Sequence, residues 1–127
     1  MKLVLIALAA SSFFGVTATA PNITKLETPP AEVSFKEKVT PLLKKYCYNC
    51  HAGEKVSKGL KLDSHAGVMK GTTYGKVVVA TKPADSVLIK SIKKIPGGSA
   101  MPPSRRKMTD AEIKIISDWI TEGAKNN

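Results

Sequence analysis

The feature that most constrains this chain is the run Cys47-Tyr48-Asn49-Cys50-His51, which contains both of its cysteines. Two thiols three residues apart on a helical turn can reach the two vinyl groups of one porphyrin. A histidine directly after the second cysteine can then act as the proximal iron ligand. The run therefore predicts one covalent haem c, with thioether bonds at Cys47 and Cys50 and with His51 bound to the iron.

Three other uses of a cysteine pair fit this sequence less well. A thioredoxin-like dithiol follows a β-strand and begins a helix, whereas this pair follows a predicted helix. A zinc site needs two further well-spaced ligands, and beyond His51 the chain has only His65. A structural disulfide would leave His51 without a role. The haem interpretation accounts for all three residues.

A haem with one histidine ligand needs a sixth ligand, and four residues are candidates. Met101 lies in an irregular loop between two glycines and two prolines, which predicts a stiff segment that can approach a porphyrin closely. Met69 falls in a short predicted helix over residues 63–70, where core packing is the commoner fate. Met108 resembles a hydrophobic staple before a helix, and His65 would give bis-histidine ligation. We expect Met101 to be the distal iron ligand.

The N-terminal residues have the layout of a secretory signal peptide. Met1-Lys2 is positive, residues 3–14 are nearly all apolar, and small residues run up to Ala20. This layout predicts a signal peptide over residues 1–20, cleaved after Ala18 or Ala20, and an exported, periplasmic protein. The alternative is an uncleaved membrane anchor, which the polar second half of the stretch disfavours.

The remaining chain divides into an extended segment over residues 21–33 and one domain over residues 34–127. Capping boxes at Ser34 and Thr109 predict the starts of the first and last helices, whose apolar faces pack together. Pro41 is expected to kink the first helix, and the residues after Gly123 are expected to fray. Another helix begins near Pro83, with one apolar face formed by Val87, Leu88, Ile92 and Ile95. Because strand signals are few, we expect an all-α domain wrapped around the haem.

Length and charge limit the functions open to the chain. Its 127 residues fit one small domain, which excludes large enzymes with separate substrate domains. No nucleophile, base and orienting group recur at a catalytic spacing, so we expect no enzyme activity.

The net charge is +10, and basic residues flank the haem-bearing segments: Lys36, Lys38, Lys44, Lys45, Lys90, Lys93, Lys94, Arg105, Arg106 and Lys107. A basic surface predicts transient contact with redox proteins that carry acidic docking surfaces, including membrane complexes. Export argues against nucleic acid as the partner, and we expect a monomer.

Several blocks of residues recur together in one known family. In chain order they are Phe35, Val39-Thr40-Pro41-Leu42-Leu43, Cys47-x-x-Cys50-His51, Lys58-Gly59-Leu60-Lys61-Leu62-Asp63, Gly67-x-x-Lys70-Gly71, Pro83-x-x-Ser86-x-Leu88, Met101-Pro102-Pro103 and Asp110-Ala111-Glu112-Ile113…Trp119-Ile120…Gly123-Ala124. Over residues 34–124 this order resembles the planctomycete-type cytochrome c domain, a relative of class I cytochromes c. The resemblance implies an all-α haem fold with His51 proximal and Met101 distal. His65 departs from the pattern, which has a basic or polar residue other than histidine there.

Two classes of function follow from these expectations. A haem with both axial positions filled cycles between Fe(III) and Fe(II), which predicts a one-electron carrier. The alternative is a haem-based sensor of small ligands, or a peroxidase-like enzyme, in which the sixth position is open or Met101 leaves it readily. A third hypothesis is a subunit that is docked permanently to a redox complex.

Overall fold

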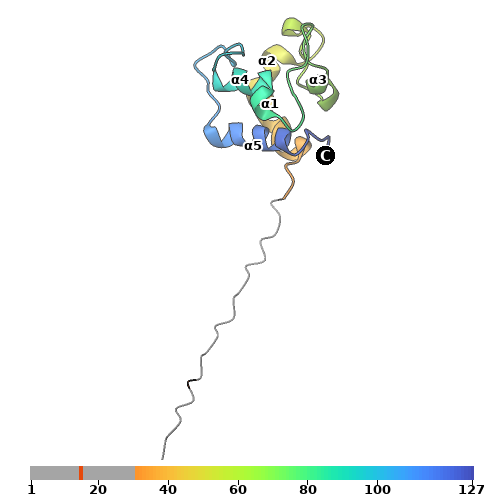
Figure 1. Ribbon diagram of the computed structural model, residues 1–127. Helices are drawn as coiled ribbons and strands as arrows, with labels where there is room; N and C mark the ends of the chain where they lie inside the picture. Colours follow the sequence, from red (N-terminus) through yellow and green to blue (C-terminus); the bar gives the residue numbers. More distant parts are fainter. Residues whose placement is uncertain (1–14, 16–30) are drawn as a thin grey trace, which may run out of the picture.

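The fold was analysed in a computed structural model that describes Gly15 and residues 31–127 (Figure 1). Apart from Gly15, the predicted signal peptide lies outside the described residues, as do residues 21–30 of the predicted extended segment. In the described part the regular elements are helices, and the only β-pairing is an isolated bridge between Thr72 and Gly75. The predicted all-α fold is confirmed.

The first helix begins as a π-helical turn, η1 (Phe35–Val39), and continues as α1 (Thr40–Tyr46). The Ser34 hydroxyl oxygen accepts the Glu37 N–H at 3.2 Å, as its predicted cap position requires. Pro41 has no N–H to continue an α-helical ladder, and it lies in the first turn of α1, directly after the π-helical turn. The irregularity expected at Pro41 therefore takes the form of a π-helical turn.

The chain then breaks at Cys47 and forms the short helix α2 (Tyr48–His51). Residues 52–86 are mostly loop, with the short elements η2 (Ser57–Gly59), α3 (His65–Lys70) and η3 (Pro83–Asp85). The helices α4 (Val87–Lys93) and α5 (Asp110–Thr121) follow, separated by a loop over residues 94–109. In the part of the chain that the structure describes, no helix is long and apolar enough to cross a bilayer.

The first and last helices pack together, as their apolar faces predict. The capping box of α5 is complete, with Thr109 and Glu112 each accepting from the other's backbone N–H. Trp119 is 1% exposed, and its ring centroid lies 5.2 Å from that of Phe35. The core continues through the other elements; its buried apolar residues include Val39, Leu43, Val68, Val78, Leu88, Ile89, Ile116 and Ile120.

The residues after Gly123 do not fray, and this prediction is wrong. Asn127 lies against the start of η1: its Oδ1 accepts the Phe35 N–H at 2.8 Å, and its carbonyl oxygen accepts the Lys36 N–H at 3.0 Å. Trp119 Nε1 donates to the Lys125 carbonyl at 2.8 Å, and Ala124 is 2% exposed. The tail is held because it satisfies helix N-terminal amides that would otherwise lack partners.

The predicted apolar face of α4 is only partly right. Leu88 and Ile92 are buried, but Val87 is 36% and Ile95 45% exposed, and Ile89 is buried instead. The helix ends at Lys93, and Lys94 takes the left-handed conformation at its C-cap. Ile95 therefore leaves the helical register, which a sequence period carried through residue 95 cannot foresee.

Candidate functional site

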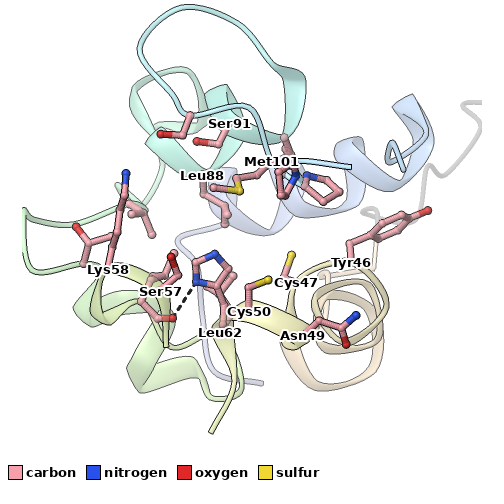
Figure 2. Close-up of a pocket in the computed structure, with 18 of the residues that line it drawn as sticks. Tyr46, Cys47, Asn49, Cys50, Ser57, Lys58, Leu62, Leu88, Ser91 and Met101 are labelled. Atoms are coloured by element: carbon pink, nitrogen blue, oxygen red, sulfur yellow. Dashed lines mark hydrogen bonds between the residues drawn. The ribbon is translucent and has the colours of Figure 1, made fainter. Parts of the chain in front are cut away.

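A cavity of about 440 Å³, lined mainly by apolar atoms, opens between α1–α2 on one side and α4 with the 99–106 loop on the other (Figure 2). Its size is within the range of ~300–1,000 Å³ typical of small-molecule and cofactor sites. The lining residues are Tyr46, Cys47, Asn49, Cys50, His51, Ser57, Lys58, Leu60, Leu62, Thr72, Val77, Val87, Leu88, Ser91, Ile92, Ser99, Met101, Pro102, Pro103, Ser104 and Arg106. The cavity brings together Cys47, Cys50, His51 and Met101, the four residues that sequence analysis singled out.

His51 is oriented by a backbone contact. Its ring is buried, and Nδ1 donates a hydrogen bond to the Leu60 carbonyl oxygen at 3.1 Å, drawn as a dashed line in Figure 2. A second bond, from the Leu62 N–H to the His51 carbonyl at 2.7 Å, ties the same two segments together. With the proton at Nδ1, the Nε2 lone pair is free to act as a ligand. In the part of the chain that is described, no hydrogen bond engages Nε2.

The two cysteines carry free thiols, and Figure 2 shows their sulfur atoms on the cavity side of the α1–α2 segment. Burial, reinforced by the neighbouring Cys50, raises the pKa of the Cys47 thiol to about 11. A redox-active dithiol needs the opposite shift, because the thiolate is the reactive species. The raised pKa of Cys47 therefore disfavours a thioredoxin-like pair.

Met101 enters the cavity from the wall opposite the cysteines, next to Leu88 and Ser91 of α4 (Figure 2). Its N–H donates to the Ser91 carbonyl oxygen at 3.0 Å, which fixes the loop to the end of α4. Pro102 and Pro103 follow it in the cavity wall. Met101 therefore reaches the cavity from a loop that is anchored to a helix.

The other three candidate ligands lie outside the cavity lining. His65 Nε2 donates to the Ala124 carbonyl oxygen at 2.7 Å, and its ring meets those of Phe35 and Trp119 edge-on. Met69 is half-buried against the core, and Met108 is 6% exposed within it. The departure from the family pattern at His65 thus has a packing role, since the imidazole fastens α3 to the C-terminal segment.

Sequence reasoning missed the contacts that Tyr46, a lining residue, makes with distant side chains. Glu112 accepts hydrogen bonds from the Tyr46 hydroxyl at 2.9 Å and from Lys45 Nζ at 2.9 Å. Arg106 lies over the Tyr46 ring, with its guanidinium carbon 6.0 Å from the ring centroid. Glu112 is 67 residues from Lys45 and 66 from Tyr46 in the chain, so no local signal could have paired them.

The charge around the cavity is one-sided. Lys58 and Arg106 line it, and its lining residues, all in the described part of the chain, include no Asp or Glu. Of the ten basic residues that the sequence placed near the haem-bearing segments, Arg106 is the one in the lining, and Lys58 was not among them. The cavity therefore carries positive charge, as the sequence predicted, but part of it comes from Lys58 in η2.

The donor set fits a haem better than it fits a metal ion bound by protein alone. Among the described residues, no group of three or more His, Cys, Asp or Glu side chains could hold a metal ion. Two thiols, one imidazole nitrogen with a free lone pair and one thioether share an apolar cavity. That combination suits an apolar macrocycle whose iron needs two axial ligands.

Comparison with known families agrees with this geometry. Residues 47–105 match the family described as Planctomycete cytochrome C. The matched segment includes both cysteines, His51, the Leu60 carbonyl and Met101. Comparison of the chain with curated proteins and with solved structures finds no match.

Proposed function

We propose that this chain, whose residues 47–105 match the Planctomycete cytochrome C family, is an electron carrier with one covalent haem c. When bound, the haem iron supplies reversible one-electron Fe(III)/Fe(II) chemistry. The observation that carries the proposal is the meeting of Cys47, Cys50, His51 and Met101 in one apolar cavity.

Each of the four side chains has a distinct role in this proposal. Cys47 and Cys50 would hold the haem through thioether bonds. His51 is the proximal ligand, and its bond to the Leu60 carbonyl fixes both the ring orientation and the tautomer. Met101 is the distal ligand, and its soft thioether favours the ferrous state and raises the potential. If His51 and Met101 both bind the iron, oxygen and peroxide would have no coordination site there, which favours electron transfer over catalysis.

The proposed partners are redox proteins with acidic docking surfaces. Lys58 and Arg106 stand at the cavity with no opposing carboxylate among its lining residues in the described chain. Complementary charge accelerates encounter and orients the carrier, and the complex stays transient because surface charges are screened by salt. The contact would be made by a monomer, with soluble or membrane-bound partners.

The proposed location is the periplasm, after export and removal of residues 1–20. Haem c attachment takes place outside the cytoplasm, so the attachment motif and the N-terminal apolar stretch support the same compartment.

The test is the visible spectrum of the protein from cells that mature c-type haem. We expect the haem to stay with the polypeptide in acid-acetone and the oxidised protein to show the weak far-red sulfur-to-iron charge-transfer band. Met101→Ala should remove that band, lower the potential and allow cyanide or carbon monoxide to bind. The matched controls His65→Ala and Met69→Ala should keep the band, since neither side chain lines the cavity.

Three results would contradict the proposal. Extraction of free haem would disprove covalent attachment. An unchanged spectrum in Met101→Ala, with loss of the native spectrum in His65→Ala, would establish bis-histidine ligation. Rapid binding of carbon monoxide by the wild-type protein would favour a ligand sensor or a peroxidase-like enzyme.

A further inference from the structure

The loop that carries Met101 contacts α4 at a glycine, Gly98. At this glycine there is no room for a side chain. An added Cβ at Gly98 would lie 2.5 Å from the Ser91 nitrogen, 2.7 Å from the Ser91 hydroxyl oxygen and 2.8 Å from the Lys90 carbonyl carbon. Two of these three atoms belong to the helix backbone, which cannot move aside as a flexible side chain can. A residue larger than glycine would have to push the loop away from α4.

The neighbouring Gly97 differs from Gly98 in its backbone conformation and in the space around it. Its φ of +92° is a conformation that residues with a side chain rarely adopt, yet an added Cβ would meet only the Lys90 side chain, 3.1 Å from Cδ. Gly97 thus serves the turn, whereas Gly98 serves the close approach. The two glycines of the loop can be separated by experiment.

The contact at Gly98 is coupled to Met101 through one residue. Ser91, on which Gly98 lies, is also the residue whose carbonyl oxygen accepts the Met101 N–H at 3.0 Å. Ser91 is 8% exposed and lines the cavity beside Met101 (Figure 2). Beyond Met101, Lys94 Nζ donates to the Ser104 carbonyl oxygen at 3.3 Å, so both ends of the segment are tied to the end of α4.

From this geometry we propose that Gly98 is a positioning residue for Met101: its bare backbone lets the loop lie close enough to Ser91 for the thioether to reach the cavity. The proposal rests on the proposed function, in which that thioether is the distal iron ligand. Any side chain at position 98 lengthens or breaks the Met101–Ser91 bond and withdraws the thioether.

The test compares two alanine variants of the haem-loaded protein that meet equally tight neighbours. At Gly67, in α3, an added Cβ would lie 2.6 Å from the Lys61 carbonyl oxygen and 2.8 Å from Lys61 Cβ, away from the cavity lining. Both Gly98→Ala and Gly67→Ala should lower the melting temperature. Only Gly98→Ala should lose the far-red band, gain carbon monoxide binding and speed hydrogen exchange at the Met101 amide.

Failure of the positioning role of Gly98 can be distinguished from failure of the proposed function. A wild-type-like band in Gly98→Ala, or loss of the band in both variants, overturns the positioning role. If Met101→Ala leaves the band intact, the ligand assignment fails, and exchange at the Met101 amide then decides the positioning role alone. If Gly98→Ala does not take up haem, hydrogen exchange at the Met101 amide of the wild-type protein decides. Exchange as fast as that of exposed loop amides overturns the proposal.

Discussion

At the scale of single residues, Glu112 connects the last helix to the segment that carries the cysteines. Its carboxylate accepts the Thr109 N–H at 2.8 Å, and the Tyr46 hydroxyl and the Lys45 ammonium also donate to it. These bonds, that of Thr109 foremost, lower the pKa of Glu112 from 4.5 to about 2. Because Tyr46 lines the cavity, the charge of Glu112 supports both the helix start and the cavity wall.

The depressed pKa predicts how acid acts on this residue. A carboxylate whose pKa is lower in the folded protein stabilises it fully above the unfolded-state pKa, near 4.5, and loses that contribution as pH falls toward about 2. Glu112→Gln should lower the free energy of unfolding at pH 7 by about 1 kcal/mol. Urea titrations of both proteins between pH 7 and pH 2 should show the difference shrinking in that window.

The matched control is Glu37→Gln, at the other predicted capping position. In the described structure Ser34 caps that helix with its hydroxyl, and no hydrogen bond to the Glu37 carboxylate supports it. Its stability profile should run parallel to that of the wild type. A constant difference between wild type and Glu112→Gln across the acid range would show that the charge of Glu112 contributes nothing.

At the scale of elements, local sequence signals predicted where helices begin. Contacts between residues far apart in the chain determined the order of the C-terminal tail and part of the candidate site. The cap at Thr109 and the apolar stripe of α5 are set within a few residues, so the sequence located that helix to its first residue. The ordered tail depends on Asn127 meeting Phe35, 92 positions away, which no periodicity encodes. The candidate site divides in the same way. The attachment motif is local and was predicted, whereas the Tyr46–Glu112 contact needed the fold.

The tail offers a test of how firmly the first and last helices are joined. Removal of residues 125–127 deletes the acceptors of the Phe35, Lys36 and Trp119 N–H groups. At roughly 1 kcal/mol for each hydrogen bond, we expect the free energy of unfolding to fall by about 2–4 kcal/mol. Urea denaturation followed by circular dichroism measures this value.

Lys125→Ala is the control for that truncation. It removes only the exposed ion pair with Glu32 and keeps the backbone carbonyl that Trp119 uses. Only a small loss of stability is expected, because an exposed ion pair is screened by solvent. If truncation costs no more than this substitution, the tail contacts do not stabilise the domain.

At the scale of the whole molecule, the excess of positive charge includes two basic residues at the cavity. The net charge is +10, and the cavity lining contributes Lys58 and Arg106. Positive charge beside the proposed redox site would accelerate anionic reactants and slow cationic ones, and salt would weaken both effects.

Charge reversal at the cavity tests this directional effect. Lys58→Glu should slow electron exchange with the hexacyanoferrate anion several-fold at low ionic strength and speed exchange with a hexaammineruthenium cation. Stopped-flow rates at several salt concentrations measure both. Lys70→Glu changes the net charge equally but lies outside the cavity lining, so it should have the smaller effect. Equal effects of the two substitutions would show that only net charge matters.

The contact of Asn127 with the start of η1 also determines how this domain can be combined with others. Its first helix and its last residue meet at one place, where the Ser34 hydroxyl donates to the Asn127 carbonyl at 3.0 Å. A segment whose first and last residues lie this close together can be spliced into a surface loop of a larger protein without stretching the host. Neither Ser34 nor Asn127 lines the cavity, so such an insertion would leave the lining residues of the candidate site unchanged.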